Sequence, residues 1–111
     1  MTIFVSERTL NIDGRSFNLE YPISEAFELN GRVIVLFNPD AYTEKFGQFQ
    51  NLIALKETGE LLWKAELPTT TSGDRYYKIV GRLPLVVYSI YSYECEIDPA
   101  TGKIKARTFF K

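Results

Sequence analysis

The chain has 111 residues, of which 45% are hydrophobic and 14% aromatic, and its net charge at neutral pH is −1. This length suits one domain, this composition excludes a disordered chain, and the balanced charge argues against nucleic acid or an anionic membrane as a partner. The sequence contains no histidine, which excludes serine–histidine and cysteine–histidine nucleophiles, histidine metal ligands and histidine pH switches. We expect a single domain over residues 1–111 with no cofactor, no metal and no catalytic residues.

The cellular location is predicted from three features. The single cysteine, Cys95, cannot form an intramolecular disulfide. Residues 1–10 lack the apolar run of a signal peptide, and no stretch approaches the roughly 20 apolar residues of a membrane span. We therefore expect a cytoplasmic protein that does not enter a membrane.

Turn signals divide the chain into short strands. Asp13-Gly14 and Asn30-Gly31 are two-residue hairpin signals, because both central residues of a type I′ turn need a positive φ. The nine expected strands are 8–12, 15–21, 26–29, 32–37, 51–56, 60–67, 76–80, 85–97 and 103–110. Since neighbouring strands are joined by short turns, we predict an all-β fold, an antiparallel meander of about eight or nine strands that forms a curled sheet, a sandwich or a barrel.

Two connections are longer than the hairpin turns. Asn38-Pro39 is a helix-start signal, which predicts one or two helical turns within Asn38–Phe46. Residues 68–74 have the composition of an irregular loop.

Two strands are apolar on both faces. Val33–Phe37 and residues 85–91 place apolar or aromatic side chains at nearly every position, so each needs cover on both sides. The predicted meander can supply this cover by curling on itself. If it does not, one face remains for a partner, and a second copy of the chain is one candidate.

Two of the expected hairpins, at residues 51–64 and 93–107, resemble each other at a spacing of about 42 residues, which is typical of a β-propeller blade. The aligned positions are Ile53 with Cys95, Leu55 with Ile97, Thr58-Gly59 with Thr101-Gly102, and Leu61 with Ile104.

These hairpins resemble the pyrroloquinoline-quinone-like β-propeller repeat, whose signature is near Ala-Leu-Asp-x-x-Thr-Gly-Lys-x-x-Trp. The matching residues are Ala54-Leu55, Thr58-Gly59 and Trp63 in the first copy, and Ile97-Asp98 and Thr101-Gly102-Lys103 in the second. Lys56 and Ala106 depart from the signature at the aspartate and the tryptophan. The resemblance implies blade-like hairpins. Two copies are too few for a closed propeller of at least four blades, and nothing in the chain is expected to hold the quinone.

A pair of carboxylates and a row of basic residues lie near the C-terminus. Glu94 and Glu96 share one strand face, a spacing that a hydrolase or a cation site can use. Lys103, Lys105 and Arg107 share a face of the next strand and, with Lys111, form a possible nucleic-acid strip. A hairpin at residues 98–102 sets the two rows opposite each other, so we expect solvated cross-strand ion pairs in place of either site.

Three kinds of side chain are assigned by strand alternation. Trp63 shares a face with Leu61, Ala65 and Leu67, which predicts a core anchor. Cys95 shares a face with Val87 and Ile97, and Tyr91 and Tyr93 are in phase with them, so these residues are expected to face the core. Tyr88 is in phase with Val86 and Ile90 on the other face, and these three residues form the possible partner surface.

The expected function is a non-enzymatic β-rich module that binds another protein, or itself, through a strand-rich face. The alternative is a small-molecule binder or small enzyme that uses only Asp, Glu and Tyr in a pocket of the sheet. A pocket with converging acids and tyrosine hydroxyls would favour the alternative. A flat apolar patch or an open sheet edge would favour the interaction module.

Overall fold

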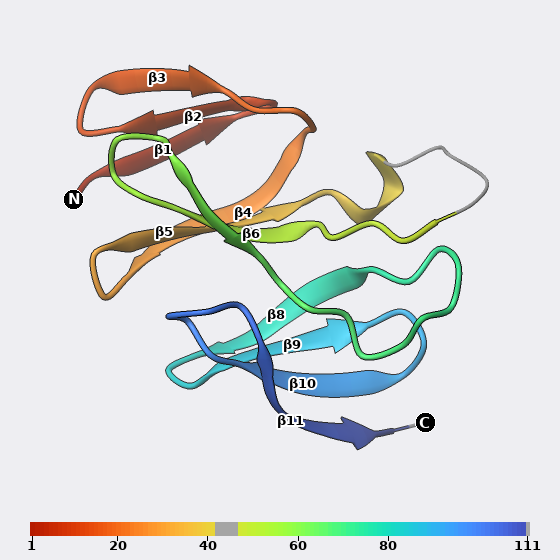
Figure 1. Ribbon diagram of the computed structural model, residues 1–111. Helices are drawn as coiled ribbons and strands as arrows, with labels where there is room; N and C mark the ends of the chain where they lie inside the picture. Colours follow the sequence, from red (N-terminus) through yellow and green to blue (C-terminus); the bar gives the residue numbers. More distant parts are fainter. Residues whose placement is uncertain (42–46, 111) are drawn as a thin grey trace.

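The computed structural model describes residues 1–41 and 47–110, and within them the chain forms eleven β-strands in three antiparallel sheets (Figure 1). The N-terminal sheet contains β1 (Ile3–Ser6), β2 (Thr9–Ile12) and β3 (Arg15–Asn18). The central sheet contains β4 (Ile23–Leu29), β5 (Arg32–Phe37), β6 (Leu52–Leu55) and β7 (Leu61–Lys64). The C-terminal sheet contains β8 (Tyr76–Arg82), β9 (Leu85–Ser89), β10 (Tyr93–Ile97) and β11 (Ile104–Phe109). The predicted all-β antiparallel class is confirmed.

The three sheets are stacked as layers, with the central sheet in the middle (Figure 1). One core cluster joins the N-terminal sheet to the central sheet, and its fully buried members include Leu10 and Val35. The other cluster joins the central sheet to the C-terminal sheet and includes Leu36 and Val87. Every residue of β6 is buried, as are the last five of β5, so the predicted cover on both faces of Val33–Phe37 is confirmed.

The strongest turn signals form the expected hairpins. Asp13 and Gly14 have φ values of 50° and 85°, and Asn30 and Gly31 have 51° and 79°, as a type I′ turn requires. The expected helical segment contains a 3₁₀ turn at Pro39–Ala41. Its remainder, residues 42–46, lies outside the described residues.

Two turns were absent from the prediction because they lack its signals. The β1–β2 turn contains Glu7 at a φ of 52°, and the expected strand over residues 85–97 is broken by a turn with Ser92 at a φ of 68°. Neither turn contains glycine, proline or asparagine. The prediction therefore missed β1 and merged β9 with β10, and the lone strand expected at residues 76–80 is paired with β9.

An aromatic ring from one sheet covers a turn glycine of the next sheet at both junctions. Phe17 of β3 lies over Gly59, where an added Cβ would be 2.5 Å from the ring. Trp63 of β7 lies over Gly102 in the same way, at 2.6 Å, and donates a hydrogen bond from Nε1 to the Pro99 carbonyl at 3.0 Å. Gly59 and Gly102 are the turn glycines of the two similar hairpins, so the hairpins occupy equivalent places in successive layers.

Replacement of Gly102 by alanine should destabilise the fold more than replacement of Gly14. Both glycines have positive φ, so each alanine costs about 1–2 kcal/mol of backbone strain. A Cβ at Gly14 meets no atom within 4 Å, whereas a Cβ at Gly102 overlaps the Trp63 ring. Chemical denaturation of Gly102→Ala and Gly14→Ala measures the difference, and equal losses would show that the Trp63 ring moves aside freely.

Candidate functional site

The outward faces of the two outer sheets differ in chemistry. On the N-terminal sheet, apart from the exposed Phe4, polar side chains pair across the strands: Thr9 donates to Asn18 at 3.0 Å and Asn11 to Ser16 at 3.2 Å. On the C-terminal sheet, aromatic and aliphatic side chains gather at the centre of the outward face, between charged residues. This second surface is therefore the unusual one, because an uncovered sheet face is normally polar.

The outer face of the C-terminal sheet is the face turned away from the central sheet. Its first row across β11, β10, β9 and β8 is Thr108, Glu94, Tyr88 and Lys78. Its second row is Ala106, Glu96, Val86 and Gly81. The inner face alternates with these rows and carries the buried Leu85, Val87, Cys95 and Ile97.

Three aromatic rings lie together on this outer face. Tyr88 occupies the middle, with its ring centroid 4.7 Å from that of Phe110 and 6.1 Å from that of Tyr77. Tyr77 and nearby Val80 are 41% and 40% exposed, so the cluster is open to solvent at the β8 side. The aromatic cluster, with Val86, makes an apolar centre on an otherwise charged surface.

The predicted partner surface falls on this outer face. Val86 and Tyr88 are half-buried members of the two rows, and Ile90 is 42% exposed in the turn that follows β9. Sequence reasoning did not assign Lys78 and Phe110 to this surface. Strand alternation could not place Lys78, because the register of β8 shifts between Tyr76 and Lys78.

Tyr91 does not face the core as predicted. It lies in the β9–β10 turn, is 40% exposed, and its hydroxyl donates to the Ser72 carbonyl at 3.0 Å. Tyr93, which begins β10, packs against the inner core cluster as expected. The turn ended the alternation on which the assignment of Tyr91 depended.

The basic row of β11 is not continuous. A register shift between Glu96 and Ile97 makes Lys105 an extra residue, and its Nζ lies 3.4 Å from Glu96 Oε2, which confirms one cross-strand ion pair. Arg107 lies across from Cys95 on the inner face, where its guanidinium is 5.9 Å from the Tyr93 ring centre and donates to the Pro68 carbonyl. The expected row of three basic side chains is therefore wrong. Lys111 lies outside the described residues.

The two outer-face charges on either side of Tyr88 are not neutralised within the chain. Glu94 lies across from Thr108, and Lys78 lies across from Tyr88. Neither Glu94 nor Lys78 takes part in an ion pair with any residue that the structure describes. Both side chains are exposed and available to a partner.

Two predicted core residues have different outcomes. Trp63 is buried, at 8% exposure, as predicted. Leu61 is 48% exposed, because a register shift between Ala54 and Leu55 sends it to the other side of β7, where it lines a hollow with Leu55 and Lys64.

Cys95 is a buried thiol with raised pKa. Burial is the main cause of the increase, and the Tyr76 hydroxyl opposes it only in part. Burial also raises the pKa of Tyr76, whose hydroxyl donates to the Glu66 carbonyl at 2.6 Å. The carboxylates that add to the increase are Asp74 and Glu66. A thiol that stays protonated at neutral pH is a poor nucleophile.

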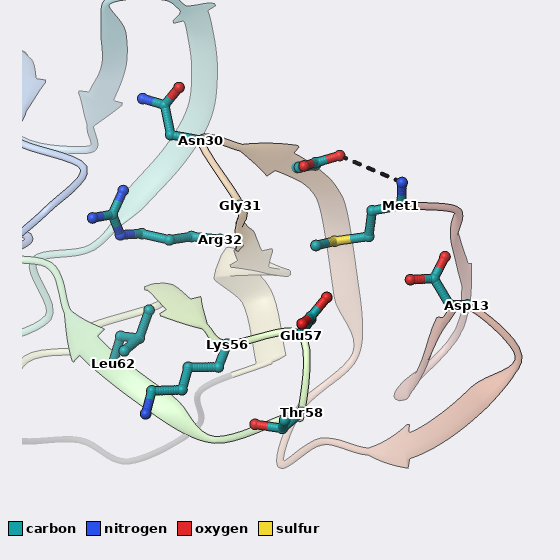
Figure 2. Close-up of a pocket in the computed structure, with 10 residues that line it drawn as sticks. Met1, Asp13, Asn30, Gly31, Arg32, Lys56, Glu57, Thr58 and Leu62 are labelled. Carbon is teal, nitrogen blue, oxygen red and sulfur yellow. Dashed lines mark ion pairs between the residues drawn. The ribbon is translucent and has the colours of Figure 1, made fainter.

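A hollow of about 600 Å³ lies beside the N-terminal and central sheets (Figure 2). Its lining includes the acids Asp13, Glu28 and Glu57 and the bases Arg32 and Lys56, but no tyrosine, and Glu28 Oε1 lies 3.8 Å from the Met1 amine. Figure 2 shows Arg32 and Lys56 extending to the side away from Asp13, so these two bases do not converge with that acid. Among the described residues, no group of three or more Cys, Asp or Glu side chains is arranged to hold a metal ion.

These features define an all-β protein of three stacked antiparallel sheets with an aromatic face left uncovered on its last sheet. Its described residues contain no helix long and apolar enough to cross a membrane. The chain belongs to the family described as a domain of unknown function, DUF7957, whose family model matches residues 1–109. No curated protein and no solved structure matches the chain.

Proposed function

We propose that this chain is a non-enzymatic protein-interaction module that binds a protein through the outer face of its C-terminal sheet. The observation that carries the proposal is the aromatic cluster of Tyr77, Tyr88 and Phe110, which no other sheet covers. The outward face of the N-terminal sheet, in contrast, is mainly polar. Burial of such a surface is favourable by about 25 cal/mol per Å² of apolar area. The chain therefore gains stability when a partner covers this face.

The composition of the face suits protein recognition. Tyrosine contributes a large rigid ring with few rotatable bonds and a hydroxyl that can bond to a partner, and it is enriched at binding hot spots. Glu94 and Lys78 flank the rings and remain exposed. This arrangement of an apolar centre with charges beside it is typical of a specific interface.

Small-molecule binding or acid-only catalysis has less support. The hollow of about 600 Å³ contains three acids but no tyrosine, and one of the acids, Glu28, is paired with the Met1 amine at 3.8 Å. A second hollow of about 420 Å³ brings Glu20 and Tyr21 together with Lys64, so it contains one acid only. Neither hollow gathers several acids and tyrosine hydroxyls.

The proposal includes a cytoplasmic location, no nucleic-acid partner and a propeller-like repeat. The balanced charge and the single buried thiol of Cys95 support the first two. The equivalent positions of Gly59 and Gly102 beneath an aromatic ring support the third.

Replacement of Tyr88 by glutamate should abolish partner binding without unfolding the chain. The glutamate removes the central ring and adds a negative charge beside Glu94. Binding of a purified partner is compared for wild type, Tyr88→Glu and the control Phe4→Ser, which changes an exposed ring on the N-terminal sheet. Far-UV circular dichroism checks the fold. Equal binding by Tyr88→Glu and wild type would refute the proposal.

A further inference from the structure

We infer that the partner on the outer face of the C-terminal sheet is a second copy of this chain, packed face to face about a two-fold axis that lies nearly parallel to β9. This inference rests on the proposed function and names its partner. The order of charges and rings across the strands is self-complementary for one two-fold symmetry and not for the other.

The first row of the outer face places opposite charges on either side of one tyrosine. Its order is Thr108, Glu94, Tyr88 and Lys78 across four neighbouring strands. Strands lie about 4.8 Å apart, so Glu94 and Lys78 each lie one strand spacing from Tyr88. Neither has an ion-pair partner among the described residues of its own chain.

We compare two face-to-face arrangements, with the two-fold axis either across the strands or along β9. An axis across the strands places Glu94 over Glu94 or Glu96 of the second copy, which brings like charges together. An axis along β9 places Tyr88 over Tyr88 and exchanges the flanking strands, so Glu94 of each copy faces Lys78 of the other. Like charges in contact oppose association and opposite charges favour it, which selects the axis along β9.

The rings follow the same symmetry. Phe110 contacts Tyr88 from the β11 side and Tyr77 contacts it from the β8 side. Rotation about β9 brings Phe110 of one copy toward Tyr77 of the other. The apolar centre and both charged flanks are therefore matched by a single operation, as an isologous dimer requires.

The size of the face sets the strength of the dimer. Four strands about 4.8 Å apart and about five residues long give a flat footprint of roughly 300 Å² per copy. Side-chain relief enlarges the accessible area, which brings the interface near the lower limit of about 1,000 Å² for specific association. We expect a reversible dimer whose dissociation constant lies in the micromolar range.

Head-to-tail stacking has weaker support. At both junctions between sheets, an aromatic ring of one sheet covers a turn glycine of the next sheet. In the central sheet, that ring belongs to Trp63, four residues after Gly59. The equivalent position in the C-terminal sheet, four residues after Gly102, is Ala106. Ala106 is exposed and has no ring to offer a further layer. The layered series therefore ends within the chain, which favours the outer face over the end of the stack.

The test reverses the two charges separately and together. Sedimentation velocity from about 1 to 500 µM should show a concentration-dependent dimer for wild type, and Glu94→Lys and Lys78→Glu should each weaken it at least about tenfold, since like charges then face each other. The double variant should recover wild-type affinity. An equimolar mixture of the two single variants should form a heterodimer, because both ion pairs reappear across the interface.

Matched controls lie in the β6–β7 turn and on β7 of the central sheet. Glu57→Lys and Lys64→Glu make the same charge changes at exposed positions away from the outer face and should leave the dimer intact. A wild-type monomer at every concentration overturns the inference but leaves the proposed function standing, since Tyr88→Glu tests that function with a different partner. A dimer unaffected by either single reversal overturns the geometry.

Discussion

Replacement of Trp63 by alanine should lower the free energy of unfolding by about 3–5 kcal/mol. The indole is 8% exposed and belongs to the core between the central and C-terminal sheets. It also covers Gly102 and donates to the Pro99 carbonyl at 3.0 Å. Removal of the ring opens a cavity and leaves that carbonyl without its partner, so both effects act at the junction between two layers.

Chemical denaturation followed by far-UV circular dichroism measures this loss, because the chain has no other tryptophan for fluorescence. Trp63→Phe keeps much of the apolar area but lacks the donor, so an intermediate loss is expected. Leu62→Ala is the control, because Leu62 is the residue next to Trp63 on β7 and its side chain is 38% exposed. A loss below about 1 kcal/mol for Trp63→Ala would show that the indole contributes no more than an exposed side chain.

The sequence predicted most of the strands because their turns carry chemical signals. Asp13-Gly14 and Asn30-Gly31 adopt positive φ at both positions, and the strands on each side follow them. The turns at Glu7 and Ser92 adopt positive φ without glycine, a conformation that other residues adopt at a cost. Both turns accept a backbone hydrogen bond from a distant segment, Glu7 from Ile23 and Ser92 from Phe110, each at 2.8 Å. Such long-range contacts are not visible in a local sequence pattern.

Register shifts limited the prediction of faces. Strand alternation correctly placed Tyr88 and Val86 on the face opposite to Val87, because β9 is paired with β10 without a bulge in that stretch. One extra residue inverts the faces of everything beyond it, and such shifts moved Leu61 and Arg107 to the opposite side from the one expected. Lys78 joined the outer face for the same reason.

The uncovered face follows from the number of layers. Two strand segments, Val33–Phe37 and residues 85–91, were expected to need cover on both sides. The central sheet has a neighbour on each side, whereas the C-terminal sheet has one on its inner side only. One face of β9 packs in the core against the central sheet, and the other face leaves Tyr88 and Val86 for a partner.

The C-terminal sheet is held in place beside this surface by a buried carboxylate. Asp74 is fully buried, and its Oδ1 accepts hydrogen bonds from the Ser89 hydroxyl at 2.6 Å and the Arg75 backbone N–H at 2.9 Å. Its Oδ2 accepts from the Thr69 hydroxyl at 2.7 Å. Asp74 therefore ties the loop that precedes β8 to Ser89, the last residue of β9 and the neighbour of Tyr88 in the chain.

Replacement of Asp74 by alanine should lower the free energy of unfolding by about 3 kcal/mol or more, because the buried Ser89 hydroxyl loses its acceptor together with Thr69 and the Arg75 amide. Asp74→Asn keeps one carbonyl oxygen, and its amide can donate to Thr69, so a smaller loss is expected. Amide hydrogen exchange should show faster exchange at residues 69–75 and at the end of β9 in the alanine variant. Unchanged protection at Ser89 and Ile90, with a loss below about 1 kcal/mol, would show that packing alone holds β9 and that the carboxylate does not position the Tyr88 surface.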